Sequence, residues 1–373
     1  MNREEYRKII YELLYLVSCA VEDKTPEKQR IENLDMEKLY KAADDHMLTA
    51  LAGYALEKCG IRDAAFVRSR GNSVRKTVIM EADKKLLFER FEEEKIWYMP
   101  LKGIVIKEFY PSLGLRQMAD FDILFDSRYA EKVHDIMYGL GFTCKDFGKG
   151  VHDTYLKKPV SNFEMHKELF GDYHAKGLYD YYMNVFDRLV KDEENNYGYH
   201  FRNEDMYIYF LAHEYKHYSE DGTGLRSLVD TYVIWKALGD TFDKDYISEE
   251  TEKIGIREFE RKNRELAFHV LQNEKLSIEE NELLDYMIYS GTYGNIENYV
   301  KHEVSRYGGG KKGKAKFVMQ KIFLPMSKVK RFYPFFYRHK ILIPCLLPYR
   351  VFKAMTVKKK NARGMLKALK KIK

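Results

Sequence analysis

The stretch LKGIVIKEFYPSLGLRQMADFDILFD, residues 101–126, places two carboxylates one residue apart inside an otherwise apolar run. Its second part, MADFDILFD, predicts a strand, in which successive side chains point to opposite faces. Asp120 and Asp122 are therefore expected to share one face with Asp126, and the opposite face is expected to enter a core through Phe121, Ile123 and Phe125. Carboxylates this close repel one another unless a cation lies between them. Such oxygen ligands favour Mg²⁺ or Mn²⁺, so the stretch predicts a divalent-metal site.

A second segment can complete this site. In Asn162-Phe-Glu-Met-His166, strand alternation puts Glu164 on one face with Asn162 and His166. If this strand lies beside the first, Glu164 becomes a third carboxylate and His166 a polar neighbour.

Upstream, Leu101-Lys-Gly103 is expected to end a strand and begin a helix. A glycine allows close approach to the backbone, and free N–H groups at a helix start attract phosphate. Lys102 and Arg116 add positive charge on either side. The segment therefore predicts phosphate contacts by Lys102, Gly103 and Arg116.

This ordered set resembles the polymerase-beta nucleotidyltransferase superfamily, and within it a family of uncharacterised bacterial nucleotidyltransferases. The elements that carry the resemblance are Leu101-Lys-Gly103, Tyr110-Pro111, Arg116, Asp120-Phe-Asp122, Ile123-Leu124 and Glu164-Met-His166. One departure is that Lys102-Gly103 stands where better-studied members carry Gly-Ser or Gly-Gly, so a phosphate-binding hydroxyl is missing.

The resemblance implies transfer of a nucleoside monophosphate from an NTP to an acceptor hydroxyl with two Mg²⁺ or Mn²⁺ ions. Asp120 and Asp122 would hold metal, with Glu164 completing the second site and helping to deprotonate the acceptor. Lys102, Gly103, Arg116 and His166 would contact the phosphates or substrate.

The patterning predicts an α+β fold with a small mixed sheet between helical regions. We expect a helical region over 1–95, the nucleotidyltransferase core over 96–177, a second helical region over 178–305 and a basic, aromatic-rich tail over 306–373. Within these regions, residues 74–99 predict one long helix that runs into a strand, residues 127–142 a helix with Ser127 as its N-cap, and residues 154–159 a further strand. Apolar spacing near the start predicts an amphipathic helix rather than a lipoprotein export signal, because Glu4, Glu5 and Glu12 interrupt the signal pattern. Four scattered cysteines fit reduced thiols in a cytoplasmic chain.

Charge is unevenly distributed along the chain. The chain has 64 basic and 57 acidic residues, and residues 301–373 contain 22 of the basic ones but only one acid, Glu303. Residues 1–300 therefore contain 42 basic and 56 acidic residues. The basic tail could bind an anionic membrane surface, RNA or the chain's own acidic body. A peripheral position on the inner membrane face would suit a membrane-linked glycan precursor as acceptor, with protein or tRNA as alternatives.

A competing motif is His213-Glu-Tyr-Lys-His217, which matches the H-E-x-x-H pattern of zinc proteases. His213 and His217 would share one face of a helix, with Glu214 as the base of a zinc metallohydrolase. The same histidines could instead pack in a core or line the acceptor pocket, perhaps with Asp230. A third class is a nucleotide-binding or interaction module without turnover.

Overall fold

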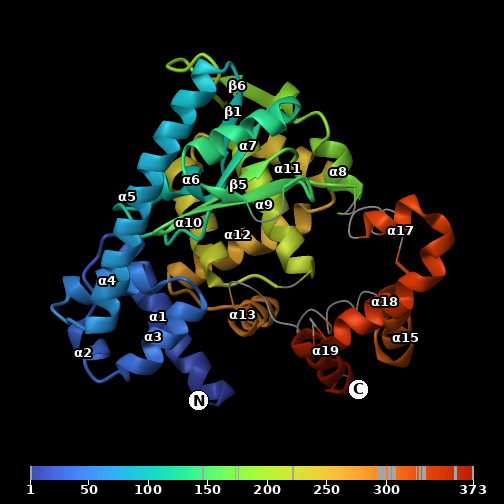
Figure 1. Ribbon diagram of the computed structural model, residues 1–373. Coiled ribbons are helices and arrows are strands. Elements are labelled where there is room, and N and C mark those ends of the chain that lie inside the picture. The colour runs from blue at the N-terminus through green and yellow to red at the C-terminus, as the bar shows by residue number, and fades with distance from the viewer. Residues whose placement is uncertain are drawn as a thin grey trace.

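The computed structural model describes residues 2–144, 147–172, 174, 176–220, 222–291, 300, 304, 308–324, 326, 329, 333–356 and 359–371. Five strands form a mixed sheet in the order β1-β2-β5-β4-β3. Their bounds are β1 Tyr98–Leu101, β2 Phe121–Phe125, β3 Thr143–Cys144, β4 His152–Lys157 and β5 Ser161–His166. β2 and β5 are parallel, and the other pairs are antiparallel. Helices flank this sheet, so the predicted α+β class is confirmed (Figure 1).

The N-terminal region is helical as predicted. Its helices are α1 Arg3–Val21, α2 Lys28–Ile31, α3 Met36–Asp45, α4 Thr49–Lys58 and α5 Ala64–Glu93. The apolar positions of α1 are buried, which confirms an amphipathic helix. α5 begins where the Asp63 carboxylate accepts hydrogen bonds from the Ala65 and Phe66 amides, and it leads into β1 as the sequence predicts.

A second set of helices follows the sheet. These are α8 Lys176–Tyr182, α9 Asn203–Glu220, α10 Leu225–Leu238, α11 Lys244–Lys253, α12 Arg257–Leu271 and α13 Ile278–Ser290, with a small hairpin of β6 Leu189–Lys191 and β7 Tyr199–Phe201. N-terminal and C-terminal helices contribute to one continuous apolar core. The division at 95, 177 and 305 stays a prediction, and residue 305 lies outside the described residues.

The two faces of β2 pack differently. Phe121, Ile123 and Phe125 enter a core shared with α5 and with α7, which spans Ala130–Gly139. Leu124 faces the other way, into the core built by the helical regions. The predicted alternation is confirmed, and it leaves the polar side chains of the strand on the side of α9 and α10.

The connection after β2 corrects one expectation. Ser127 was the expected N-cap of the next helix, but Asp126 caps the short 3₁₀ turn Ser127–Tyr129 that precedes α7. The Asp126 carboxylate accepts from the Arg128 amide at 3.1 Å and pairs with the Arg128 guanidinium. Because these groups hold it, Asp126 takes no part in the polar face around Asp122.

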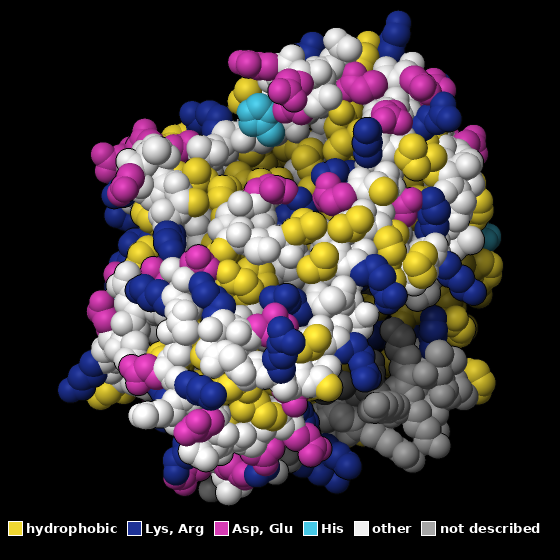
Figure 2. Space-filling model, turned by 90° about the vertical axis from the view of Figure 1, so that its left-hand side faces the viewer, with side chains coloured by type: hydrophobic (Ala, Val, Ile, Leu, Met, Phe, Trp, Pro, Cys, Tyr) yellow, Lys and Arg dark blue, Asp and Glu magenta, His cyan; other side chains and the backbone are white. Residues whose placement is uncertain are grey.

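The tail forms helices beside the body in Figure 1: α15 Gly310–Ile322, α17 Pro334–Arg338, α18 Ile343–Thr356 and α19 Lys359–Lys371. Phe317 and Ala368 of the tail form a small separate core with Val300 and Val304, which precede it. Within the described ranges, no helix is long and apolar enough to cross a membrane. On the opposite flank, which carries α4 and α5, acidic and basic side chains are interspersed (Figure 2).

His46, in the turn between α3 and α4, is expected to make folding pH-dependent. Its ring is fully buried, and Nδ1 accepts a hydrogen bond from the Leu225 amide at 3.3 Å. Burial lowers the pKa of His46 from 6.5 to about 4. Between these values the unfolded chain binds a proton that the native chain does not, so the free energy of unfolding falls as pH falls.

We expect the wild type to lose about 2 kcal/mol through this group between pH 7.5 and pH 5. In urea unfolding at the two pH values, His46→Gln should lose correspondingly less stability than the wild type. Equal losses in the two proteins would contradict the assignment.

Candidate functional site

Three carboxylates meet where β2 and β5 lie side by side. The two strands are parallel neighbours, and Asp122 and Glu164 are direct partners in their register. Asp120 precedes β2 by one residue, and all three side chains line one cavity of about 310 Å³. The neighbourhood of the two strands, on which the predicted site depends, is confirmed. That these carboxylates act in catalysis stays a prediction.

Asp122 is buried between two cationic or hydrogen-bonding groups. Its Oδ1 lies 2.6 Å from Lys102 Nζ and 2.8 Å from His166 Nε2. Burial would raise the pKa of Asp122, but Lys102 and His166 outweigh burial and hold the pKa well below its usual range. Burial likewise opposes the charge of Lys102, whose pKa is nevertheless raised by Asp122. Both groups are therefore ionised near neutral pH.

Asp120 lies in a different electrostatic environment on the same face. Burial and the charges of Asp122 and Glu164 raise the pKa of Asp120 to about 6. Glu164 has the opposite shift: burial would raise its pKa, but the neighbouring His166 side chain helps to lower it. The site thus contains a carboxylate whose charge is poorly compensated by protein groups, which is typical of carboxylates that receive a cation.

Lys102 and Gly103 form a tight turn between β1 and α6, which spans Gly103–Ile106. Lys102 has φ 49° and ψ −120°, a conformation that side chains disfavour, and strain of this kind clusters at functional sites. A Cβ at Gly103 would lie 2.4 Å from Arg116 Nη1 and 2.5 Å from Met118 Cε. A side chain at this position would displace the ends of Arg116 and Met118, so glycine lets these two side chains pack against the turn, from which Lys102 reaches Asp122.

Arg116 reaches the same cavity but is held by α10. Its Nε and Nη2 each lie 2.8 Å from a carboxylate oxygen of Asp230, which also accepts from the Tyr110 hydroxyl at 2.7 Å. Nη1 lies 3.1 Å from Met118 Sδ. These contacts fix the segment before β2 against α10, and the predicted contact of Arg116 with phosphate stays a prediction.

The H-E-x-x-H motif lies on α9 and faces this same cavity. His213 and His217 approach to 3.2 Å between their Nε2 atoms, while Glu214 accepts from the Thr223 hydroxyl at 2.8 Å. Among the residues described, no third ligand atom joins the two histidines in a metal-binding group. Asp230, the nearest acidic candidate, is held by Arg116 and Tyr110. The zinc-protease interpretation therefore lacks a third ligand.

Burial keeps both histidines uncharged. It lowers the pKa of His213 well below its usual value and, with Lys216 and Lys102 adding to the effect, lowers that of His217 to about 3. Of the alternatives that the sequence left open for this pair, placement in a pocket beside the carboxylates agrees with the cavity lining.

Sequence reasoning missed several cavity residues, among them His152, Lys216 and Arg226. His152 begins β4, two residues before the predicted start of that strand, and is the register partner of His166. Counting back through the tight turn between Lys157 and Ser161 gives this pairing, so the signal was present in the sequence. Arg226 follows the loop after α9, and nothing local in the sequence marks it as part of the cavity.

Two parallel strands that present three carboxylates beside a strained Lys-Gly turn are the arrangement expected of a nucleotidyltransferase. A family model described as "Uncharacterised nucleotidyltransferase" matches residues 32–272, more than half of the chain, and the protein belongs to this family. It is therefore an enzyme of the nucleotidyltransferase class, which binds a nucleotide substrate. No curated protein and no solved structure matches the chain significantly.

Proposed function

We propose that the protein transfers a nucleoside monophosphate from an NTP to an acceptor hydroxyl with two divalent cations. The observation that carries this proposal is the direct pairing of Asp122 with Glu164 across β2 and β5, with Asp120 on the same cavity wall. Lys102, Lys216 and Arg226 line the cavity as well and supply the positive charge that a triphosphate requires.

The donor set fits Mg²⁺ or Mn²⁺. Such ions take carboxylate oxygens together with substrate phosphates. Lys102 Nζ lies 2.6 Å from Asp122 Oδ1, so the protein itself pairs this carboxylate with a positive charge. Asp120 and Asp122 would hold one ion and Glu164 would contribute to the other.

Each protein group has a part in the proposed reaction. Bound Mg²⁺ would neutralise the charge that develops on the transferred phosphoryl group. Glu164, whose pKa is lowered, is ionised near neutral pH and can accept the proton of the acceptor hydroxyl. Lys102 lines the cavity, and contact of its ammonium with the phosphates would keep the substrate aligned. Pyrophosphate is the leaving group.

The test of this proposal is a labelling experiment. The full-length protein is incubated with Mg²⁺, cell extract and each NTP labelled at the α-phosphate. We expect label from one nucleotide in a protein, RNA or lipid-linked glycan fraction, and none after chelation of the metal. Nucleotide binding without labelling of any fraction would favour a binding module over a transferase.

Replacing Lys102 by Met tests whether its ammonium competes with the metal. Since Lys102 Nζ lies 2.6 Å from Asp122 Oδ1, its removal should tighten Mg²⁺ binding several-fold without nucleotide. Transfer should nevertheless slow, because the phosphates lose a positive partner. Calorimetry and the labelling assay measure the two effects, and weaker Mg²⁺ binding in Lys102→Met would contradict this account.

We also propose that the tail binds an anionic membrane surface. Apolar side chains are exposed in α17 and in the short 3₁₀ turn Lys340–Leu342 that follows it: Phe335 is 58% and Ile341 is 89% exposed. Basic residues Arg338, Lys340 and Arg350 lie in the same segment. Exposed apolar groups beside dense positive charge favour the interface of an anionic bilayer. A lipid-linked glycan precursor would then be a suitable acceptor.

Sedimentation with vesicles tests this second proposal. We expect the full-length protein to bind vesicles with 30% anionic lipid and to bind purely zwitterionic vesicles at least tenfold more weakly. The variant Phe335→Ser/Ile341→Ser should lose most of this binding, whereas Val78→Ser on the distant helix α5 should not. Equal binding to both kinds of vesicle would contradict the proposal.

A further inference from the structure

A second group of potential metal ligands lies beside the carboxylates and contains two imidazoles. His152, Glu164 and His166 each offer one ligand atom, and these atoms lie within 4.8 Å of one another. The three residues come from the antiparallel neighbours β4 and β5, where His152 and His166 are register partners. Two rigid strands therefore bring the ligand atoms together.

The distances agree with those of a metal centre. Nε2 of His152 lies 3.5 Å from Glu164 Oε2, and Nε2 of His166 lies 3.7 Å from the same oxygen. In a tetrahedral zinc site with bonds of 2.0–2.1 Å, ligand atoms are ~3.3 Å apart. The three ligand atoms lie within 4.8 Å of one another, so the side chains would move closer together to share one ion, and the ion would replace the 2.8 Å contact between His166 Nε2 and Asp122 Oδ1.

The two rings also have hydrogen-bonding capacity that the protein does not use. His166 is 3% exposed, and its Nδ1 has no hydrogen-bond partner among the described residues. The Nδ1 atom of His152 is buried and likewise lacks a partner within the described part of the chain. The atoms nearest Glu164 are the two Nε2 atoms, so these would bind the ion, and each Nδ1 would carry the imidazole proton, as in histidines that bind metal through Nε2.

We propose that His152, Glu164 and His166 bind a transition-metal ion such as Zn²⁺ or Co²⁺ in preference to Mg²⁺. Imidazole ligands select these ions, whereas carboxylates alone favour Mg²⁺. This inference specifies the second ion of the proposed function. It rests on that function because Glu164 is the residue proposed above to hold the second ion. The cavity would then hold two different kinds of ion, one on Asp120 and Asp122 and one on the histidines.

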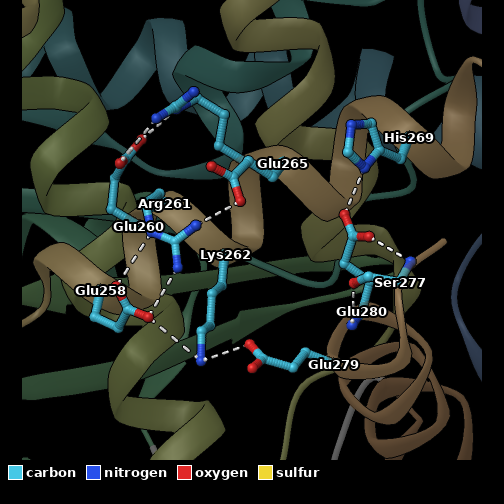
Figure 3. A network of polar contacts seen from close by, with 10 residues as sticks. Glu258, Glu260, Arg261, Lys262, Glu265, His269, Ser277, Glu279 and Glu280 are labelled. Carbon is cyan, nitrogen blue, oxygen red and sulfur yellow. Dashed lines mark hydrogen bonds and ion pairs between the residues drawn. The ribbon is translucent and has the colours of Figure 1, made fainter.

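Cobalt titration of the metal-free, full-length protein tests this site. We expect one Co²⁺ to bind with visible absorption bands of nitrogen and oxygen ligation, and His152→Ala to weaken binding at least tenfold. The matched control is His269→Ala. Figure 3 shows His269 beside Glu280 in an ion-pair network of α12 and α13. The variant His269→Ala therefore removes an imidazole that contacts carboxylates but has no second histidine among its contacts there. The control should bind Co²⁺ as the wild type does.

A second variant, His152→Asp, keeps a ligand but changes its chemistry, and it remains informative if His152→Ala does not fold. We expect the ratio of Co²⁺ to Mg²⁺ affinity to fall at least tenfold in this variant. The proposal is overturned if the wild type binds no Co²⁺, if His152→Ala binds it unchanged, or if His152→Asp keeps the wild-type ratio.

Nucleotide binding in Mg²⁺, measured on the same preparations, separates this inference from the proposed function. Failure of Co²⁺ binding with intact Mg²⁺-dependent nucleotide binding would overturn the transition-metal site alone. Co²⁺ binding without nucleotide binding in any metal would support the site and overturn the proposed function.

Discussion

Replacing Asp122 by Asn is expected to reduce nucleotidyl transfer by roughly 10³-fold. The substitution keeps the size of the side chain but removes the charge that pairs with Lys102 and His166. It therefore removes an anionic metal ligand and leaves the buried Lys102 ammonium without its partner. The measurement is the rate of label transfer from the α-labelled NTP under saturating Mg²⁺.

The matched control for this result is Asp126→Asn. Asp126 follows the same strand, but its carboxylate caps the next turn and pairs with Arg128. We expect this variant to retain transfer within a few-fold of the wild type. A folded Asp122→Asn protein with wild-type transfer would show that the paired carboxylates are not the reaction centre.

Replacing Arg116 by Met is expected to destabilise the protein by about 3–5 kcal/mol. Arg116 and Asp230 are both almost fully buried and form a two-pronged ion pair with contacts of 2.8 Å. Removing only the guanidinium leaves Asp230 buried with the Tyr110 hydroxyl as a neutral partner. Urea unfolding at pH 7 measures the loss, and Arg116→Met/Asp230→Leu should recover part of it, because the unpaired charge is then removed as well.

The control for burial is Arg261→Met. Arg261 pairs with Glu258 and Glu265 in the exposed network of Figure 3, where water screens the charges. This variant should unfold with little or no change in urea midpoint. A similar destabilisation by Arg116→Met and Arg261→Met would contradict the view that the buried pair holds the cavity wall together.

Local patterns predicted much of the fold. Alternation along β2 correctly separated the apolar face of Phe121, Ile123 and Phe125 from the polar face, because a strand has a side-chain period of two. Helical spacing predicted α1 and the long helix α5, since their apolar stripes follow the helical period. The cap at Asp126 was missed because Ser127 and Asp126 are both good capping residues, and only the observed backbone distinguishes them.

The cavity was less predictable, because it is assembled from distant segments. Asp230 meets Arg116 only because α10 docks against the segment before β2, and no local pattern encodes that contact across 114 residues. His213 and His217 match a protease motif in the sequence. Their surroundings, however, are the carboxylates of β2 and β5 that line the same cavity, and the motif alone does not indicate these neighbours. His152 was accessible to reasoning, because the register of a tight hairpin follows from its turn.

The most direct test of the central claim is calorimetric titration of the full-length protein with an NTP in Mg²⁺. The claim is that Asp120 and Asp122 hold the cation through which nucleotide binds, so the wild type should bind and Asp120→Ala/Asp122→Ala should not. Asp126→Asn, treated identically, should bind like the wild type. Unchanged Mg²⁺-dependent binding in a folded Asp120→Ala/Asp122→Ala protein would contradict the account.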